Sequence, residues 1–185
     1  EEAVRLTAEV QSGEDEVLAR ATLSRVLLDQ DAPKKALDEL DVLVPLLDTF
    51  DTEGIASQVH AWRAVALARL DREVEAEAAL ERAATIEPEW PLIKVRTDLA
   101  FAEALRALGR RDAARERLQK SLQAAEAHGY RHYQLAAHDG LSVVVTDDTT
   151  RARHSRVASA LARSLAANLT REDASRFLAR GWGTR

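Results

Sequence analysis

Few side chains in this sequence could do chemistry on their own, and the histidines come first among them. His128 and His132 are four residues apart, which is the spacing that lets two imidazoles on one continuous helix bind the same metal ion. Gly129 interrupts a helix at this point, and no third ligand stands at a matching spacing. We therefore expect no metal site. The remaining histidines are His60, His138 and His154.

Signals for catalysis and cofactor binding are equally weak. The sequence has no Gly-rich phosphate-binding loop and no serine, histidine and aspartate whose spacing supports a catalytic triad. It has no cysteine, which excludes disulfides and thiol chemistry. The acidic pair Asp147 and Asp148 precedes a predicted helix, so capping of that helix explains it better than acid–base catalysis. We expect a protein that is not an enzyme and needs no cofactor.

A basic segment between Thr149 and Glu172 contains no acidic residue, so it could meet phosphate groups or an acidic partner. No aromatic residues are interleaved with its arginines, and its last arginine does not share a helix face with the first two. We therefore interpret the segment as a solvated helix face and do not expect nucleic acid as a partner. Its arginines are Arg151, Arg153, Arg156 and Arg163.

One pattern of residue types occurs three times in the chain. Each copy has a large residue, a small residue, a leucine, a turn residue, an alanine and a second leucine, always at the same spacing. The turn residues are 40 and then 38 residues apart, and a period in this range is typical of a stacked repeat array. The copies are Leu23-Ser24-x2-Leu27-x3-Asp31-x4-Ala36-x3-Leu40, Arg63-Ala64-x2-Leu67-x3-Asp71-x4-Ala76-x3-Leu80 and Phe101-Ala102-x2-Leu105-x3-Gly109-x4-Ala114-x3-Leu118.

The order of these residues has a physical explanation. The large–small pair lets two antiparallel helices approach closely, and the following leucine lies on the same helix face. A short polar turn comes next, and Pro33 suits the first turn of the new helix because its missing N–H is not needed there. The alanine then faces the first helix, and the second leucine fills the seam. One pair cannot bury its apolar face alone, so neighbouring pairs must stack on it.

The pattern resembles the tetratricopeptide repeat (TPR) family over residues 20–126, and Pro88 stands where that family often ends a unit. The chain departs from the family at Arg63, where the family has an apolar residue, and it carries leucine in place of most of the family's aromatic residues. Its units are also longer than the usual 34 residues. The resemblance implies an all-α fold in which antiparallel helix pairs stack into a right-handed superhelix.

We expect a single repeat domain over residues 1–185. Residues 1–12 would form a half repeat, residues 15–50, 54–88 and 91–127 three repeats, residues 130–169 a divergent pair with Gly140 as its small residue, and residues 170–180 a capping helix. Pro45 should kink or end its helix near Val44. The predicted helices cover residues 2–11, 15–30, 34–49, 54–70, 73–86, 91–108, 111–127, 131–145, 150–168 and 171–180.

Composition sets further bounds. Hydrophobic residues make up 46% and charged residues 31% of the chain, which is ordinary for a helical globular protein. No apolar run approaches the ~20 residues that a membrane span needs, and no signal-peptide pattern occurs. We expect a cytoplasmic protein with no membrane partner.

The start of the chain indicates a piece of a longer protein. Methionine is absent even at residue 1, and residues 1–11 have the spacing of a second helix whose first helix would precede it.

A stacked repeat array mostly holds partners, and the first helix of each pair lines its concave face. We therefore expect a groove that binds a protein or peptide. Arginine is enriched at binding hot spots and its planar fork grips carboxylates, so an acidic or C-terminal peptide segment is the expected ligand. The candidate groove residues are Arg25, Asp29, Val65, Arg69, Arg96, Leu99, Glu103, Arg106, Tyr133 and Ala137. Trp62 and Trp90 are interpreted as packing residues.

The segment from Ser164 to Leu178 is similar to the closing segment of repeat regions attached to bacterial signalling proteins. This similarity favours a regulatory domain of a bacterial multidomain signalling or transcription-regulatory protein. One alternative is a domain that senses a peptide or small ligand and controls an attached effector. Another is self-association into a homo-oligomer, because residues 1–90 carry a net charge of −12 and residues 91–185 one of +7.

Overall fold

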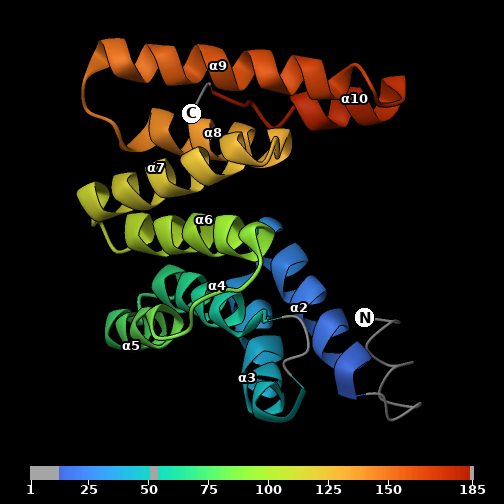
Figure 1. Cartoon of the computed structure of the whole chain (residues 1–185), viewed down its shortest axis with the longest axis vertical. Coiled ribbons are helices and arrows are strands. Elements are labelled where there is room, and N and C mark those ends of the chain that lie inside the picture. Colours follow the sequence, from blue (N-terminus) through green and yellow to red (C-terminus); the bar gives the residue numbers. More distant parts are fainter. Residues whose placement is uncertain (1–12, 51–53, 184–185) are drawn as a thin grey trace.

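The computed structural model describes residues 13–50 and 54–183, and within these ranges the chain is all-α, with no strand. Along the long axis of the molecule α6, α7, α8 and α9 follow one another in chain order, while α2 to α5 gather at the other end (Figure 1). The predicted helix 2–11 lies outside the described residues. The helices are α2 (Gly13–Asp29), α3 (Pro33–Phe50), α4 (Ala56–Arg69), α5 (Glu73–Ala84), α6 (Pro91–Ala107), α7 (Arg111–Ala127), α8 (Arg131–Val144), α9 (Asp148–Ala166) and α10 (Arg171–Leu178).

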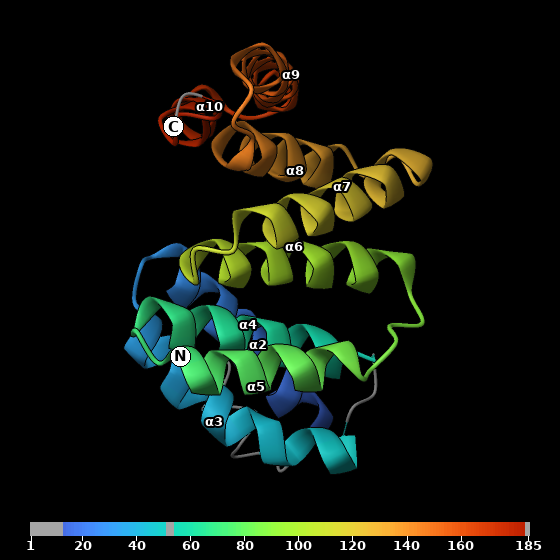
Figure 2. The same cartoon turned by 90° about the vertical axis from the view of Figure 1, so that its left-hand side faces the viewer.

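Consecutive helices pack as pairs, and the pairs stack on one another. The closest packing joins α2 to α3, α4 to α5, α6 to α7 and α8 to α9. Successive pairs meet where α4 packs on α3, α6 on α4 and α8 on α7, which gives the layered arrangement in Figure 2. The all-α class and the packing in pairs are confirmed. The right-handed TPR superhelix stays a prediction.

The nine predicted helices within the described ranges are confirmed, with every end within two residues of its prediction. Of the two outcomes expected at Pro45, an end of the helix near Val44 does not occur, because α3 continues through the proline to Phe50. The proline removes a single backbone hydrogen bond. Leu43 and Leu47, on either side of it, are both buried in the core, and this packing holds the helix together across the missing bond.

The three repeated motifs form the seams of the pairs. Ala36, Ala76 and Ala114 are fully buried, as close approach of two helices requires. Arg63, which departs from the motif, does not open its unit. Its Nε donates to Oδ1 of Asp41 at 2.8 Å, so the charged end leaves the seam and links α4 to α3.

The turn residues of the motif share one backbone conformation. Asp31, Asp71 and Gly109 have φ angles of 55°, 57° and 74°, so each ends its helix in the left-handed region. In each turn the next N–H donates to the carbonyl of the motif leucine, at 2.9, 3.0 and 2.8 Å for Leu27, Leu67 and Leu105. The equal spacing of leucine and turn residue in the sequence therefore reflects one recurring hydrogen-bonded helix end.

The fourth pair and the end of the chain are held by more specific contacts. A Cβ added to Gly140 on α8 would lie 2.7 Å from Leu118 Cδ2 on α7, so glycine is what allows these helices to meet. The cap predicted at the acidic pair is confirmed, since Asp147 accepts from the Thr150 N–H at 2.7 Å. Thr170 caps α10 in the same way, accepting from the Asp173 N–H at 3.2 Å. Within the described ranges, no helix has both the length and the apolar character to cross a bilayer.

Gly109 offers a test of the turn. Gly109→Ala should lower the free energy of unfolding by about 1 kcal/mol, since a side chain disfavours the left-handed conformation while nothing lies within 4 Å of the added Cβ. Thermal unfolding followed by circular dichroism measures the change. The matched control is Asp71→Gly, which puts glycine into the equivalent turn and should not lower stability. An equal loss in both variants would contradict the interpretation.

Candidate binding groove

The first helices of the four pairs line a groove with a volume of about 780 Å³. It extends from α2 across α4 and α6 to α8, and the end of the chain after α10 closes part of one side. This volume falls in the range of sites for small ligands and short peptides, roughly 300–1,000 Å³. The groove spans all four pairs, so a single bound molecule could contact several of them.

The structure brings eight of the ten candidate residues together in this groove. Val65 and Ala137 are the exceptions: both are fully buried, so neither can contact a partner. Val65 lies on α4, which has neighbours on nearly every side because α2, α3, α5 and α6 all pack against it. Ala137 lies on α8 among α6, α7 and α9. The residues present in the groove are Arg25, Asp29, Arg69, Arg96, Leu99, Glu103, Arg106 and Tyr133.

Glu103 of α6 is the centre of a charge network across the groove floor. Its carboxylate accepts from the guanidinium of Arg69 on α4 and, at 3.5 Å, from Nη1 of Arg25 on α2. Arg25 also pairs with Asp29 at 2.6 Å, and Arg69 donates to the Leu28 carbonyl at 2.7 Å. The Arg69 and Glu103 side chains are only partly exposed, so their contact is less screened than a surface ion pair such as Arg25–Asp29. One carboxylate thus links three consecutive first helices.

Arg96 and Arg106 are held differently from these two arginines. The Arg96 guanidinium lies over the Trp62 ring, 5.6 Å from its centroid. When the Gln58 amide is oriented with its oxygen toward Arg96, that oxygen accepts from Nε and Nη2 at 3.0 and 3.1 Å. Arg106 is exposed, and no described residue forms an ion pair with it. Neither guanidinium is neutralised by a described carboxylate, so this part of the groove is electropositive.

His132 and Tyr133 form an aromatic edge where α8 begins. Their ring centroids are 5.6 Å apart with the planes nearly perpendicular. Burial, followed by the charges of Arg180 and Arg25, lowers the pKa of His132 from its ordinary value of 6.5. His132 is therefore mostly neutral at pH 7 and offers a hydrogen-bonding ring nitrogen rather than a positive charge.

The segment after α10 brings two groove residues that the sequence analysis missed, Arg180 and Trp182. The Gly183 N–H donates to Oδ1 of Asp139 at 2.7 Å, and Ser159 Oγ donates to the Trp182 carbonyl at 3.0 Å. A Cβ on Gly183 would lie 2.4 Å from the Ser155 carbonyl oxygen. The glycines on either side of Trp182, both with positive φ, were the available signal that the chain folds back here.

Apart from His132, the histidines and the basic segment considered in the sequence analysis do not line the groove. The turn at Gly129 separates His128 from His132, and no group of three metal-ligating side chains occurs in the described part of the chain. His138 on α8 and His154 on α9 share a hydrogen bond between their Nδ1 atoms at 2.8 Å. In the basic segment, Arg151 donates to the carbonyls of Val145 and Thr146 at the turn before α9.

Comparison of the chain with protein-family models, with curated proteins and with solved structures finds no match.

Glu103→Gln tests the network across the groove floor. We expect it to lower the free energy of unfolding by about 1–2 kcal/mol, because the uncharged amide leaves Arg25 and Arg69 without their shared carboxylate. Denaturant unfolding measures the loss. Glu116→Gln, on the exposed face of α7, is the matched control and should change stability by less than about 0.5 kcal/mol. If the two variants have the same stability, the network does not hold the helices together.

The histidine pair predicts a pH dependence of stability. Burial, with the nearby His154 and Arg153, lowers the pKa of His138 from 6.5 to about 4. The unfolded chain therefore binds this proton at a higher pH than the folded protein does, and stability falls as the pH drops from about 6.5 to 4. In His138→Gln the melting temperature should fall less between pH 7 and pH 4.5 than in the parent. The exposed His128→Gln is the control, and an unchanged pH profile in His138→Gln would contradict the prediction.

Proposed function

We propose that this protein is a binding scaffold whose groove holds a segment of a protein or peptide partner. The observation that carries the proposal is the convergence of four helix pairs on one groove with both charged and aromatic walls. The three repeated motifs support a TPR-like architecture for the scaffold. We further propose that it acts as a regulatory domain of a bacterial cytoplasmic protein, on the basis of its closing segment and its lack of cysteine.

The groove is suited to binding because its floor is fixed before a partner arrives. The Glu103 network joins α2, α4 and α6, so their relative positions do not have to be ordered on binding. Association is costly when loops and side chains must be immobilised, and a preorganised groove avoids part of that cost.

The charges favour an acidic ligand. Arg25 and Arg69 are already paired with carboxylates of the chain itself. Arg96 and Arg106 also line the groove, but neither forms an ion pair with a carboxylate of the described residues. A ligand carboxylate would pair with these two guanidinium groups, and the buried Trp62 ring holds the Arg96 guanidinium in place for that contact. The ligand class we propose is an acidic peptide segment.

Sensing is a second candidate, and the extent of the groove favours it. Because one ligand would touch residues from Arg25 on α2 to Tyr133 on α8, its binding would favour one relative arrangement of the pairs. An attached effector domain could respond to that arrangement.

The double variant Arg96→Gln/Arg106→Gln tests the proposal. Selection from a random peptide library should enrich acidic sequences, and the double variant should bind a selected peptide at least about tenfold more weakly, as expected for loss of charge-assisted hydrogen bonds. Fluorescence polarisation measures both affinities. Arg111→Gln/Arg171→Gln removes the same charge from exposed positions away from the groove and should bind like the parent. Failure to enrich acidic peptides, or full affinity in the groove variant, would refute the proposal.

A further inference from the structure

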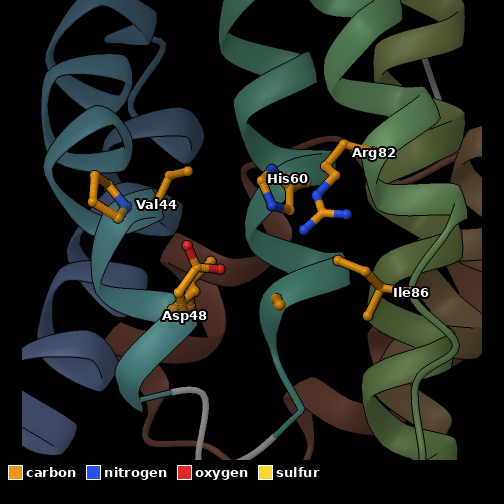
Figure 3. Close-up of a pocket in the computed structure, with 8 residues that line it drawn as sticks. Val44, Asp48, His60, Arg82 and Ile86 are labelled. Carbon is orange, nitrogen blue, oxygen red and sulfur yellow. The ribbon is translucent and has the colours of Figure 1, made fainter.

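A second cavity lies between α3, α4 and α5 and shares no residue with the groove. Its volume is about 390 Å³, enough for a small organic molecule. Figure 3 shows that it opens between the ribbon of α3 on one side and those of α4 and α5 on the other.

Three polar side chains from three different helices face this cavity. They are Asp48 on α3, His60 on α4 and Arg82 on α5. In Figure 3 the Arg82 guanidinium lies beside the His60 ring, and the Asp48 carboxylate lies across from them. Asp48 and Arg82 are opposite in charge and line the same cavity, yet neither forms an ion pair within the described residues. A cation and an anion thus face one space without neutralising each other.

His60 adds hydrogen-bonding capacity rather than charge. Burial, then the positive charges of Arg82 and Arg63, lowers its pKa below 6.5, against the smaller opposite effect of Asp48. At pH 7 the ring is therefore mostly neutral and can both donate and accept a hydrogen bond.

The remaining walls are apolar. Leu47 is buried in the core, and Val44 and Ile86 are half-buried and flank the polar groups (Figure 3). An apolar cavity with a few convergent polar groups is the usual form of a site for a small ligand.

We propose that this cavity binds a small zwitterion with an apolar body, namely a free aliphatic α-amino acid. Its carboxylate pairs with the planar fork of Arg82 and accepts from His60, and its ammonium group pairs with Asp48. Its side chain packs against Val44 and Ile86. The inference does not depend on the groove, because the two sites are lined by different residues.

Isothermal titration calorimetry at pH 7 tests the ligand class with leucine and two analogues that keep its branched apolar end. The analogue 3-methylbutylamine lacks the carboxylate, and 4-methylpentanoate lacks the ammonium group. We expect leucine to bind and each analogue to bind at least about tenfold more weakly, since each has lost one ion pair. Equal affinity of either analogue would overturn the proposal, as would the absence of saturable binding by leucine, isoleucine and valine up to about 10 mM.

Two variants test the residues. Arg82→Gln and Asp48→Asn should each weaken leucine binding at least about tenfold, as loss of one charge-assisted contact predicts. Both side chains are exposed, so the fold should be kept, and an unchanged melting temperature without ligand verifies this. The controls Arg111→Gln and Asp38→Asn make the same changes at exposed positions outside the cavity and should leave the affinity unchanged. Full leucine affinity in either cavity variant would overturn the assignment.

Discussion

The rest of the structure depends on the close contact of two helices at a buried alanine. Ala36, Ala76 and Ala114 occupy equivalent places in three pairs, and each lets the second helix of its pair lie against the first. A pair held this way still exposes apolar surface on its flank, and the next pair covers it. The groove follows from this stacking, because it places the first helices of four pairs along one side.

Charged residues use this scaffold in two different ways. At Glu103 a carboxylate of the chain forms ion pairs with two arginines, and these ion pairs join neighbouring helices. At Arg96 and Arg106, and again at Asp48 and Arg82, the charged groups face a groove or cavity without an ionic partner among the described residues. Charges that join helices and charges that face open space can therefore be told apart by their partners but not by their residue types.

Local features of the fold could be predicted from the sequence, whereas contacts between distant segments could not. Helix positions follow from residue spacing, and the turns at Asp31 and Gly109 follow from short-range backbone preferences. Eight of the ten residues that helix order predicts for the groove do line it, but the burial of Val65 depends on four neighbouring helices. The return of Trp182 to the groove depends on hydrogen bonds between residues far apart in the chain, and no periodicity encodes them.

The placement of the tryptophans has a practical consequence. Of the three in the chain, Trp62 and Trp182 line the groove, whereas Trp90 is exposed in the linker before α6. Indole emission depends on the polarity around the ring, so a molecule that displaces water from the groove would alter the fluorescence of the half-buried Trp182 more than that of the buried Trp62 or of Trp90. The chain thus carries its own optical reporter of groove occupancy, and no dye has to be attached to follow it.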